Sequence, residues 1–135
     1  MKCQIIIDRK TEIIVCTELY NGKAHDGTIF KETTHVNPNI LLLGDSGYRG
    51  IQKIHPNTLL PIRHKADIDK LSDEQKANRK SNNKKIASVR MKIEHVIGRV
   101  KNFKIVSEKY RNHRKRLLLR FNLICGIVNY EHCCT

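Results

Sequence analysis

Two short runs rich in apolar and β-branched residues open the chain, at residues 2–8 and 12–18. The polar residues 8–11 join them, and this pattern predicts an antiparallel hairpin. Residues 25–34 are predicted to form a short helix, with Asp26 near its start, where a helix favours negative charge. The chain therefore begins with a predicted hairpin followed by a helix.

An apolar run at residues 40–43 leads into a turn-forming sequence with an aspartate, a serine and two glycines. We interpret the run as a buried strand with Asp45 at its mouth, followed by a turn and a short helix over residues 46–54. Another short strand is expected at residues 59–62. Its Pro61 places it at a sheet edge or strand end, because proline has no N–H to donate to a neighbouring strand.

Residues 65–85 are polar and charged, and we expect a mobile or partly helical insert or linker. Ser72 and Gln75 have the spacing of a capping box, which marks the start of a helix. Residues 86–101 predict a firmer helix, because apolar residues recur there at steps of three and four. These apolar positions are Ile86, Val89, Ile93, Val96 and Val100.

The polar residues of the predicted helix at residues 86–101 lie on two different sides of it. At about 100° per residue, Arg90, Glu94 and Lys101 fall together beside the apolar stripe, which places Glu94 at the border between core and solvent. Arg99, Lys92 and His95 face elsewhere and are expected to be open to solvent or phosphate.

The last third of the chain predicts a brief extended piece at residues 103–106 and a final helix from about residue 112 to 132. Apolar residues occur on several faces of this helix, so we expect it to pack between two layers. At 135 residues the chain is expected to form a single domain, residues 1–135, of the α/β class.

Charge narrows the choice of partner. The chain has 26 Lys and Arg against 13 Asp and Glu, a net charge of +13, and the excess lies mainly between residues 63 and 120. This excess favours a polyanion, and we expect nucleic acid. The alternatives are an anionic membrane surface, a ribosome-type protein or a merely basic soluble protein.

The remaining composition points to the cytoplasm. No apolar run approaches the roughly 18 residues that span a bilayer, so we expect a soluble protein with no membrane partner. The five cysteines are odd in number and contain no C-x-x-C pair. We therefore expect neither a disulfide framework nor a zinc site, and a reducing compartment.

Two carboxylates stand out because acids are scarce in this chain. Asp45 follows an apolar strand and Glu94 lies on a cation-rich helix, a combination typical of metal-dependent phosphodiester chemistry. Each also has an ordinary interpretation. Asp45 is a common turn residue, and Glu94 is four residues from Arg90, the spacing of a solvated helical ion pair.

The two motifs together resemble those of DDE transposases of bacterial insertion sequences, in the ribonuclease H-like superfamily. Asp45-Ser46-Gly47-Tyr48-Arg49-Gly50 is similar to the second-aspartate motif of that family. Arg90, Glu94 and Lys101, with His95, Ile97 and Gly98, are similar to the signature around its catalytic glutamate. The loop from Gly22 to His25-Asp26 matches as well, so that the resemblance covers essentially the whole chain. At Ala87 the chain departs from many relatives, which carry tyrosine there, and that phosphate contact is not expected here.

The resemblance implies a function and its cofactors. It implies metal-dependent cleavage and transfer of DNA strands, with two Mg²⁺ (or Mn²⁺) ions held by two aspartates and a glutamate. Asp45 and Glu94 would be two of these ligands. Arg90 and Lys101, together with Arg99, Tyr48 and Arg49, would contact DNA at transposon ends and target. The protein would be nucleoid-associated, as a homo-oligomer or in association with full-length transposase.

The first catalytic aspartate of this family lies on a central first strand that the chain does not supply. The expected fold is thus a ribonuclease H-like mixed sheet flanked by helices and missing its first strand. Asp8 and Asp26 are the internal alternatives for this acid, but Asp8 occupies a hairpin turn and Asp26 a loop that leads into a helix. We expect a truncated copy that is inactive alone. The alternative is a non-catalytic basic DNA-binding remnant, or an inhibitor of full-length transposase.

Overall fold

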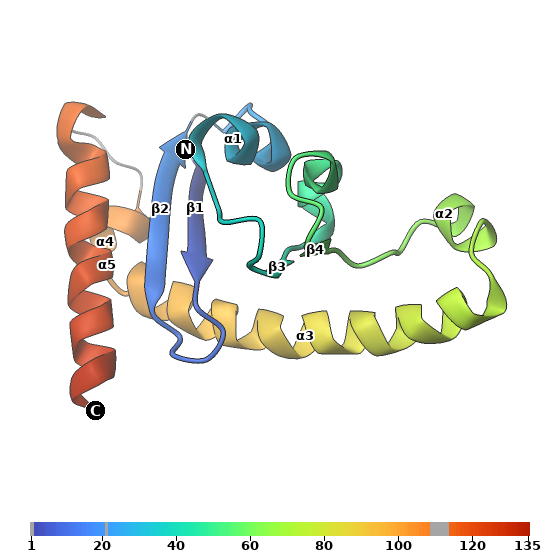
Figure 1. Ribbon diagram of the computed structural model, residues 1–135. Coiled ribbons are helices and arrows are strands. Elements are labelled where there is room, and N and C mark those ends of the chain that lie inside the picture. The colour runs from blue at the N-terminus through green and yellow to red at the C-terminus, as the bar shows by residue number, and fades with distance from the viewer. Residues whose placement is uncertain (1, 21, 109–113) are drawn as a thin grey trace. The chain divides into compact units, whose positions relative to one another are not determined.

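A computed structural model of the chain describes residues 2–20, 22–108 and 114–135. The described part is a mixed α/β structure with two small sheets and several helices (Figure 1). It divides into two compact units. We call residues 1–22 and 90–135 the terminal unit and residues 23–89 the middle unit. None of the described helices has the length and apolar character needed to cross a membrane.

The predicted hairpin is confirmed in the terminal unit. Strands β1 (Lys2–Ile7) and β2 (Ile14–Tyr20) pair antiparallel, with a register irregularity between Ile6 and Ile7. The turn is wider than predicted, so that β2 begins two residues later. Its ends are joined by the Asp8 N–H, which donates to the carbonyl oxygen of Ile13 at 2.9 Å.

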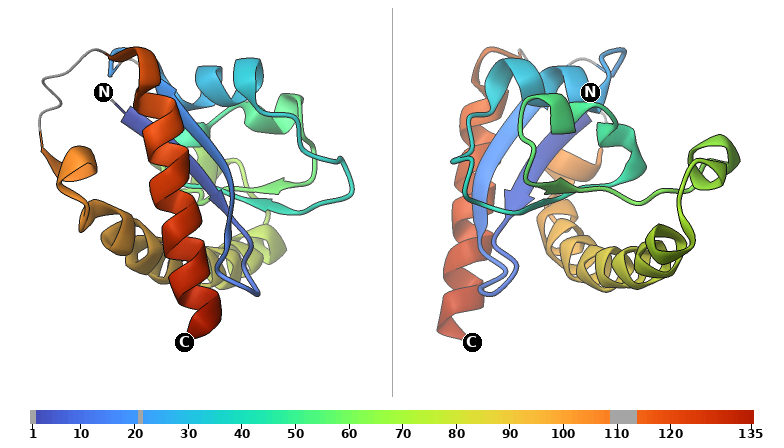
Figure 2. Two further views of the ribbon diagram at one scale, coloured as in Figure 1. Left: turned by 90° about the vertical axis from the view of Figure 1, so that its left-hand side faces the viewer. Right: turned by 45° about the vertical axis from the view of Figure 1, so that its right-hand side comes forward.

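Helix α5 (Leu117–Cys134) packs against this hairpin. Both views of Figure 2 place α5 on one face of the hairpin. The core cluster here joins β2, the end of helix α3 (Asp73–Lys101) and α5. Its buried members are Ile14, Val96, Val100, Phe121, Ile124, Cys125 and Val128.

The prediction that the last helix packs between two layers is wrong. Its opposite face carries Leu119, Leu123 and Tyr130, which are 68%, 65% and 72% exposed. The helix also begins later than predicted: residues 114–116 form a 3₁₀ turn, and residues 112 and 113 lie outside the described part. Residues 104–107 form the short helix α4 (Lys104–Ser107) where an extended piece was expected.

The middle unit begins with helix α1 (Asp26–Thr33), as predicted. Two 3₁₀ turns, η1 (Ser46–Tyr48) and η2 (Ile51–Lys53), account for the predicted turn and short helix. Ile29, Phe30 and Ile51 are buried, and the ring of Phe30 meets Tyr48 edge-on at 6.4 Å between centroids. Aromatic and aliphatic packing therefore holds α1 to the 45–54 segment.

The two strands of the middle unit are shorter than predicted. Strand β3 (Leu42–Leu43) pairs in parallel with β4 (Thr58–Leu59). The expected burial of residues 40–43 is wrong: Ile40 and Leu41 are about half exposed, at 53% and 54%. Within the described residues, β3 has a single partner strand, and two residues of ladder cannot cover the run.

The polar segment and the helix after it form one element. After the short helix α2 (Lys65–Asp69), helix α3 (Asp73–Lys101) runs for 29 residues, and the capping box starts it. The Ser72 N–H donates to Gln75 Oε1 at 3.0 Å, and the Gln75 N–H donates to Ser72 Oγ at 3.3 Å. Continuous helix through residues 73–85 was not predicted, because few apolar residues mark it.

Side chains anchor the first part of α3 within the middle unit. The Asn83 amide brackets the backbone of Ile62: its Oδ1 accepts from the Ile62 N–H, and its Nδ2 donates to the Ile62 carbonyl, both at 3.3 Å. Arg79 Nη1 also donates to the Ile62 carbonyl, at 3.2 Å. These contacts satisfy the backbone just beyond β4, and so help to hold a polar helix that buries little apolar surface.

Candidate functional site

Asp45 caps the turn that follows β3. Its Oδ1 accepts from the Ser46 N–H at 2.7 Å, and its carbonyl oxygen accepts from the Tyr48 N–H at 3.0 Å. This is the local role that the turn interpretation predicts. The half-buried carboxylate is also an oxygen donor of the type that Mg²⁺ prefers, so the cap and a metal role are compatible.

The start of α1 lies against the Asp45 turn. An added Cβ at Gly47 would lie 3.2 Å from Asp26 Oδ2, and one at Gly27 would lie 3.5 Å from the carbonyl oxygen of Arg49. Glycine thus permits a close approach of these two segments. The middle unit therefore brings Asp26 beside the Asp45 turn, which the sequence did not indicate.

Tyr48 and Arg49, both predicted to contact DNA, have partners inside the middle unit. Tyr48 packs on Phe30, as described above. Arg49 Nη2 pairs with Asp67 Oδ2 at 2.8 Å, with the arginine side chain 65% exposed. This pair connects the turn to α2. Their predicted role in DNA contact stays a prediction.

Glu94 lies in the terminal unit, on the part of α3 that ends the helix. Its Oε1 accepts from Arg90 Nε at 3.1 Å, the ion pair that the ordinary interpretation predicts. The prediction that Glu94 lies at the core border is wrong, because its side chain is 60% exposed and extends along the helix surface to Arg90. Such an exposed i,i+4 pair contributes only about 0.3–0.5 kcal/mol to stability.

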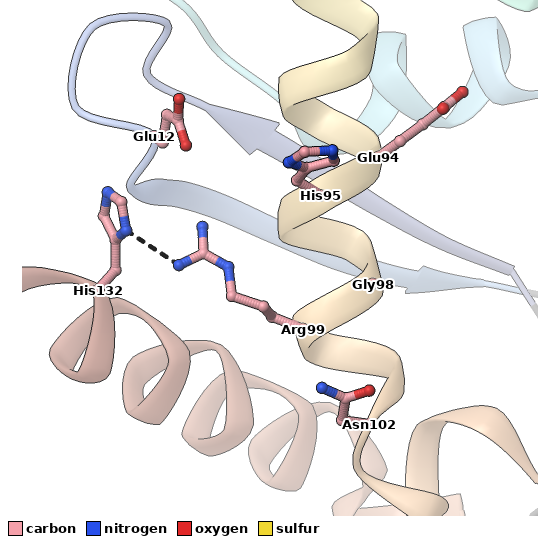
Figure 3. Close-up of a pocket in the computed structure, with 7 residues that line it drawn as sticks. All are labelled: Glu12, Glu94, His95, Gly98, Arg99, Asn102 and His132. Carbon is pink, nitrogen blue, oxygen red and sulfur yellow. Dashed lines mark hydrogen bonds between the residues drawn. The ribbon is translucent and has the colours of Figure 1, made fainter. Parts of the chain in front are cut away.

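A cavity of about 600 Å³ opens beside this part of α3, wide to the solvent. Its lining comes from the hairpin turn, α3 and α5: Glu12, Glu94, His95, Gly98, Arg99, Asn102 and His132. In Figure 3 the Arg99 side chain extends toward His132, whereas Glu94 points away from it. The residues that line the cavity carry carboxylates, imidazoles, an amide and a guanidinium.

Arg99 and His132 form a hydrogen bond across this cavity. Arg99 Nη1 lies 2.9 Å from His132 Nδ1, and His132 Nε2 lies 2.9 Å from the carbonyl oxygen of Thr11 (Figure 3 draws the first of these). Sequence reasoning missed His132. Its partners are 33 and 121 residues away, and no local pattern marks it.

Lys92 pairs with Glu12 at the rim of the same cavity, with 3.4 Å between Nζ and Oε1. Glu12 has a left-handed backbone, with φ of 58°, which an L-residue rarely adopts. The prediction that Arg99, Lys92 and His95 are open to solvent is confirmed for Lys92 and His95, which are exposed, whereas Arg99 is half-buried. The hydrogen bond of Arg99 and the ion pair of Lys92 were not predicted, and a role in phosphate contact stays a prediction.

Asp8 and Lys101 complete the predicted residues of the terminal unit. The backbone N–H groups of Thr11 and Lys10 donate to Asp8 Oδ1 at 3.1 and 2.7 Å and hold the pKa of this exposed carboxyl below its ordinary value. Asp8 is thus the turn residue that the hairpin requires. Lys101 is exposed.

The described residues only partly suit a divalent metal. Asp45 and Glu94 supply the right donor type, but one belongs to the middle unit and the other to the terminal unit. In the described part of the chain, no three His, Cys, Asp or Glu side chains group so as to hold a metal ion. The carboxylates in the described part of the chain are therefore at most part of a metal site.

Comparison with known proteins places these features in a family. The DDE superfamily endonuclease family matches residues 1–129. A protein of Microchaete diplosiphon named "Probable transposase for insertion sequence element IS702" is 42% identical over 133 residues. The match covers 97% of this chain and 46% of that relative, so the chain spans about half the relative's length. No solved structure matches the chain.

Proposed function

Because the chain belongs to the DDE superfamily of endonucleases, we propose that it forms part of the catalytic domain of an insertion-sequence transposase. The family match over residues 1–129 carries this proposal. The identity of 42% to a probable transposase supports it. The substrate would be DNA, cleaved and joined at transposon ends and target.

The strand pairing supports a ribonuclease H-like fold. Among the described residues, β1 pairs with β2 in an antiparallel sheet, and β3 pairs with β4 in a parallel one. An antiparallel pair and a parallel pair are the two kinds of pairing that a mixed sheet contains, and a further strand would be needed to complete it. We propose that such a strand, with the first catalytic aspartate, comes from sequence outside these 135 residues.

Asp45 and Glu94 would then be two of the three carboxylates that hold the divalent ions, Mg²⁺ or Mn²⁺, which this family generally uses. Of the two internal alternatives for the third acid, Asp26 lies beside the Asp45 turn, whereas Asp8 caps a hairpin in the terminal unit. With two of three carboxylates, the 135-residue chain is expected to be inactive by itself.

Binding of DNA would rest on the net charge of +13 and on exposed cations of the two motifs. Arg90 and Lys101 on α3, with Arg49 on the Asp45 turn, are exposed and suited to phosphate oxygens. Arg99 and Tyr48 would contribute from more enclosed positions. The exposed apolar face of α5 supports association with a second copy or with full-length transposase.

The alternative function is non-catalytic: a basic DNA-binding remnant that occupies transposon ends or inhibits full-length transposase. The observation that favours it is the lack of a three-residue metal cluster in the described part of the chain. The two functions differ in whether Asp45 and Glu94 take part in DNA cleavage once the third carboxylate is supplied.

The test uses the 135-residue chain with a labelled DNA duplex, with and without Mg²⁺. We expect binding that weakens steeply between 50 and 200 mM salt, because neutralised phosphates release counterions. We expect no cleavage by the chain alone. Asp45→Asn and Glu94→Gln should bind DNA as well as the unaltered chain or better, because each removes a negative charge.

Two exposed acids away from both motifs, Asp69→Asn and Glu32→Gln, serve as matched controls for the change of charge. Mg²⁺-dependent cleavage that Glu94→Gln abolishes and Glu32→Gln preserves would show a complete enzyme and overturn the expected inactivity. Binding that does not respond to salt would overturn the proposal of a DNA partner.

A further inference from the structure

We infer that His132 is a positioning residue, which orients Arg99 in the cavity beside α3 to bind a phosphate group of the DNA backbone. The inference rests on the proposed function, because it assigns a ligand class to one cavity of a DNA-binding protein. It adds a residue from α5 that lies outside both family motifs.

Three elements of the terminal unit meet at His132. The imidazole comes from α5, its Nδ1 faces Arg99 Nη1 of α3 at 2.9 Å, and its Nε2 faces the Thr11 carbonyl of the hairpin turn at 2.9 Å. The turn itself is held by Asp8, whose carboxylate accepts from the Lys10 N–H at 2.7 Å. The imidazole is therefore held at both nitrogens by ordered parts of the unit.

The partners determine the protonation of the ring. A carbonyl oxygen only accepts, so His132 Nε2 must carry the proton and donate it to Thr11. A guanidinium only donates, so His132 Nδ1 must be unprotonated and accept from Arg99. His132 is consequently a neutral imidazole in one tautomer while both hydrogen bonds exist.

A neutral acceptor suits an arginine that binds an anion. A carboxylate in the same place would neutralise the guanidinium, whereas an imidazole orients it and leaves its positive charge for a phosphate. The nearby carboxylate of Glu12 pairs instead with Lys92, at 3.4 Å. Arg99 thus keeps a net charge at the cavity, where His95 and Asn102 provide further hydrogen-bonding groups.

Orientation matters because a free arginine side chain has many rotamers. Ordering such a side chain on binding costs conformational entropy, and a bond formed beforehand removes part of this cost. The competing explanation is that the Arg99–His132 bond simply joins α3 to α5. The two explanations make different predictions for two conservative replacements of the histidine.

His132→Asn places an amide oxygen where Nδ1 stood, so it keeps the acceptor for Arg99 and loses the donor to Thr11. His132→Gln places an amide nitrogen where Nε2 stood, so it keeps the donor to Thr11 and loses the acceptor for Arg99. If His132 positions Arg99, the asparagine variant retains DNA affinity and the glutamine variant does not. If it only joins the helices, both lose stability and neither has a selective effect on DNA.

The measurements are DNA affinity by fluorescence anisotropy at several salt concentrations and thermal stability, with the 135-residue chain. Arg99→Gln should weaken binding about tenfold and lower the slope of log affinity against log salt by about one. His132→Gln should weaken binding about three- to tenfold, and His132→Asn less than twofold. His132→Gln added to Arg99→Gln should have no further effect, because the histidine acts through the arginine.

His35→Gln, an exposed histidine of the middle unit, is the matched control and should bind as the unaltered chain does. Nitrogen-15 NMR of the His132 ring in the free protein should show a protonated Nε2 and a bare Nδ1. Equal affinities for His132→Gln and the unaltered chain, or equal losses for both replacements, would overturn the inference alone. Failure of the unaltered chain to bind DNA would overturn the proposed function and the inference with it.

Discussion

The amide of Asn129 is the best place to test how the terminal unit is held together. Its Oδ1 accepts from the Ile14 N–H and its Nδ2 donates to the Ile14 carbonyl, both at 2.9 Å. Ile14 begins β2 and is 7% exposed, so water cannot readily replace the amide. Asn129 and His132 lie one turn apart on α5, and the same packing therefore supports the cavity.

The expected cost of Asn129→Ala follows from the two groups that it leaves behind. Each lost hydrogen bond contributes about 0.5–1.5 kcal/mol net, and a buried N–H or C=O left unsatisfied costs about 1–3 kcal/mol. Partial access of water to the end of the strand reduces the upper figure. We expect a decrease of about 2–4 kcal/mol in the free energy of unfolding.

Asn129→Asp separates the two bonds. The carboxylate still accepts from the Ile14 N–H but sets an oxygen against the Ile14 carbonyl, so that at pH 7 the loss should equal or exceed that of Asn129→Ala. On acidification the protonated carboxyl can donate to that carbonyl. Because the folded state then favours the protonated form, the deficit relative to the unaltered chain should shrink as the pH falls.

The assay is urea unfolding followed by circular dichroism at pH 7 and at pH 4. The exposed neighbour Glu131→Ala is the control and should change the free energy of unfolding by no more than about 0.5 kcal/mol. A loss below about 0.5 kcal/mol for Asn129→Ala would refute the reasoning, because it would mean that water satisfies Ile14. An Asn129→Asp deficit that is the same at both pH values would refute the assigned geometry.

Three further outcomes are expected. Burial raises the pKa of the Cys125 thiol to about 11, whereas Cys133 is exposed. At pH 8 iodoacetamide should therefore label Cys133 well before Cys125, as followed by mass spectrometry of the native chain. Equal labelling rates would contradict the burial of Cys125. Ser72→Ala removes the capping box and should destabilise the start of α3 by about 1 kcal/mol. Hydrogen exchange in the first turn of α3 should then be faster. Unchanged exchange would mean that the cap is dispensable. Gly50→Ala should lower the free energy of unfolding by about 1 kcal/mol, because the φ of Gly50 is 92°. Gly126→Ala should raise it by about 0.5–1 kcal/mol through helix propensity, because the added Cβ meets no described atom within 4 Å. The reverse order in urea unfolding would contradict the backbone argument.

Much of the local structure follows from the sequence alone. Turn chemistry and β-branched runs predict the hairpin, and the position of Asp26 predicts the start of α1. Capping-box spacing predicts the first residues of α3. Each of these depends on residues a few positions apart, and the same is true of the apolar stripe that predicts the buried side of α3. The two motifs around Asp45 and Glu94 are equally local, which is why they pointed to the family.

Other features required the tertiary structure, because their partners are distant in sequence. The polar residues 73–85 are helical although they carry no apolar stripe, and contacts of Arg79 and Asn83 with Ile62 help to hold them. The outer face of α5 is exposed because only one layer covers this helix in the described part of the chain.

The contacts of the cations show most clearly that partners distant in sequence cannot be predicted from a local pattern. The helical periodicity predicts on which side of α3 Arg99 lies, but it cannot predict that a histidine 33 residues later accepts a hydrogen bond from Arg99. Sequence therefore determined the family, the local elements and the acidic and basic residues of the motifs. The packing of α5 and the hairpin against α3 decided which of those charges are held in place, since side-chain geometry depends on neighbours that the chain brings together only by folding.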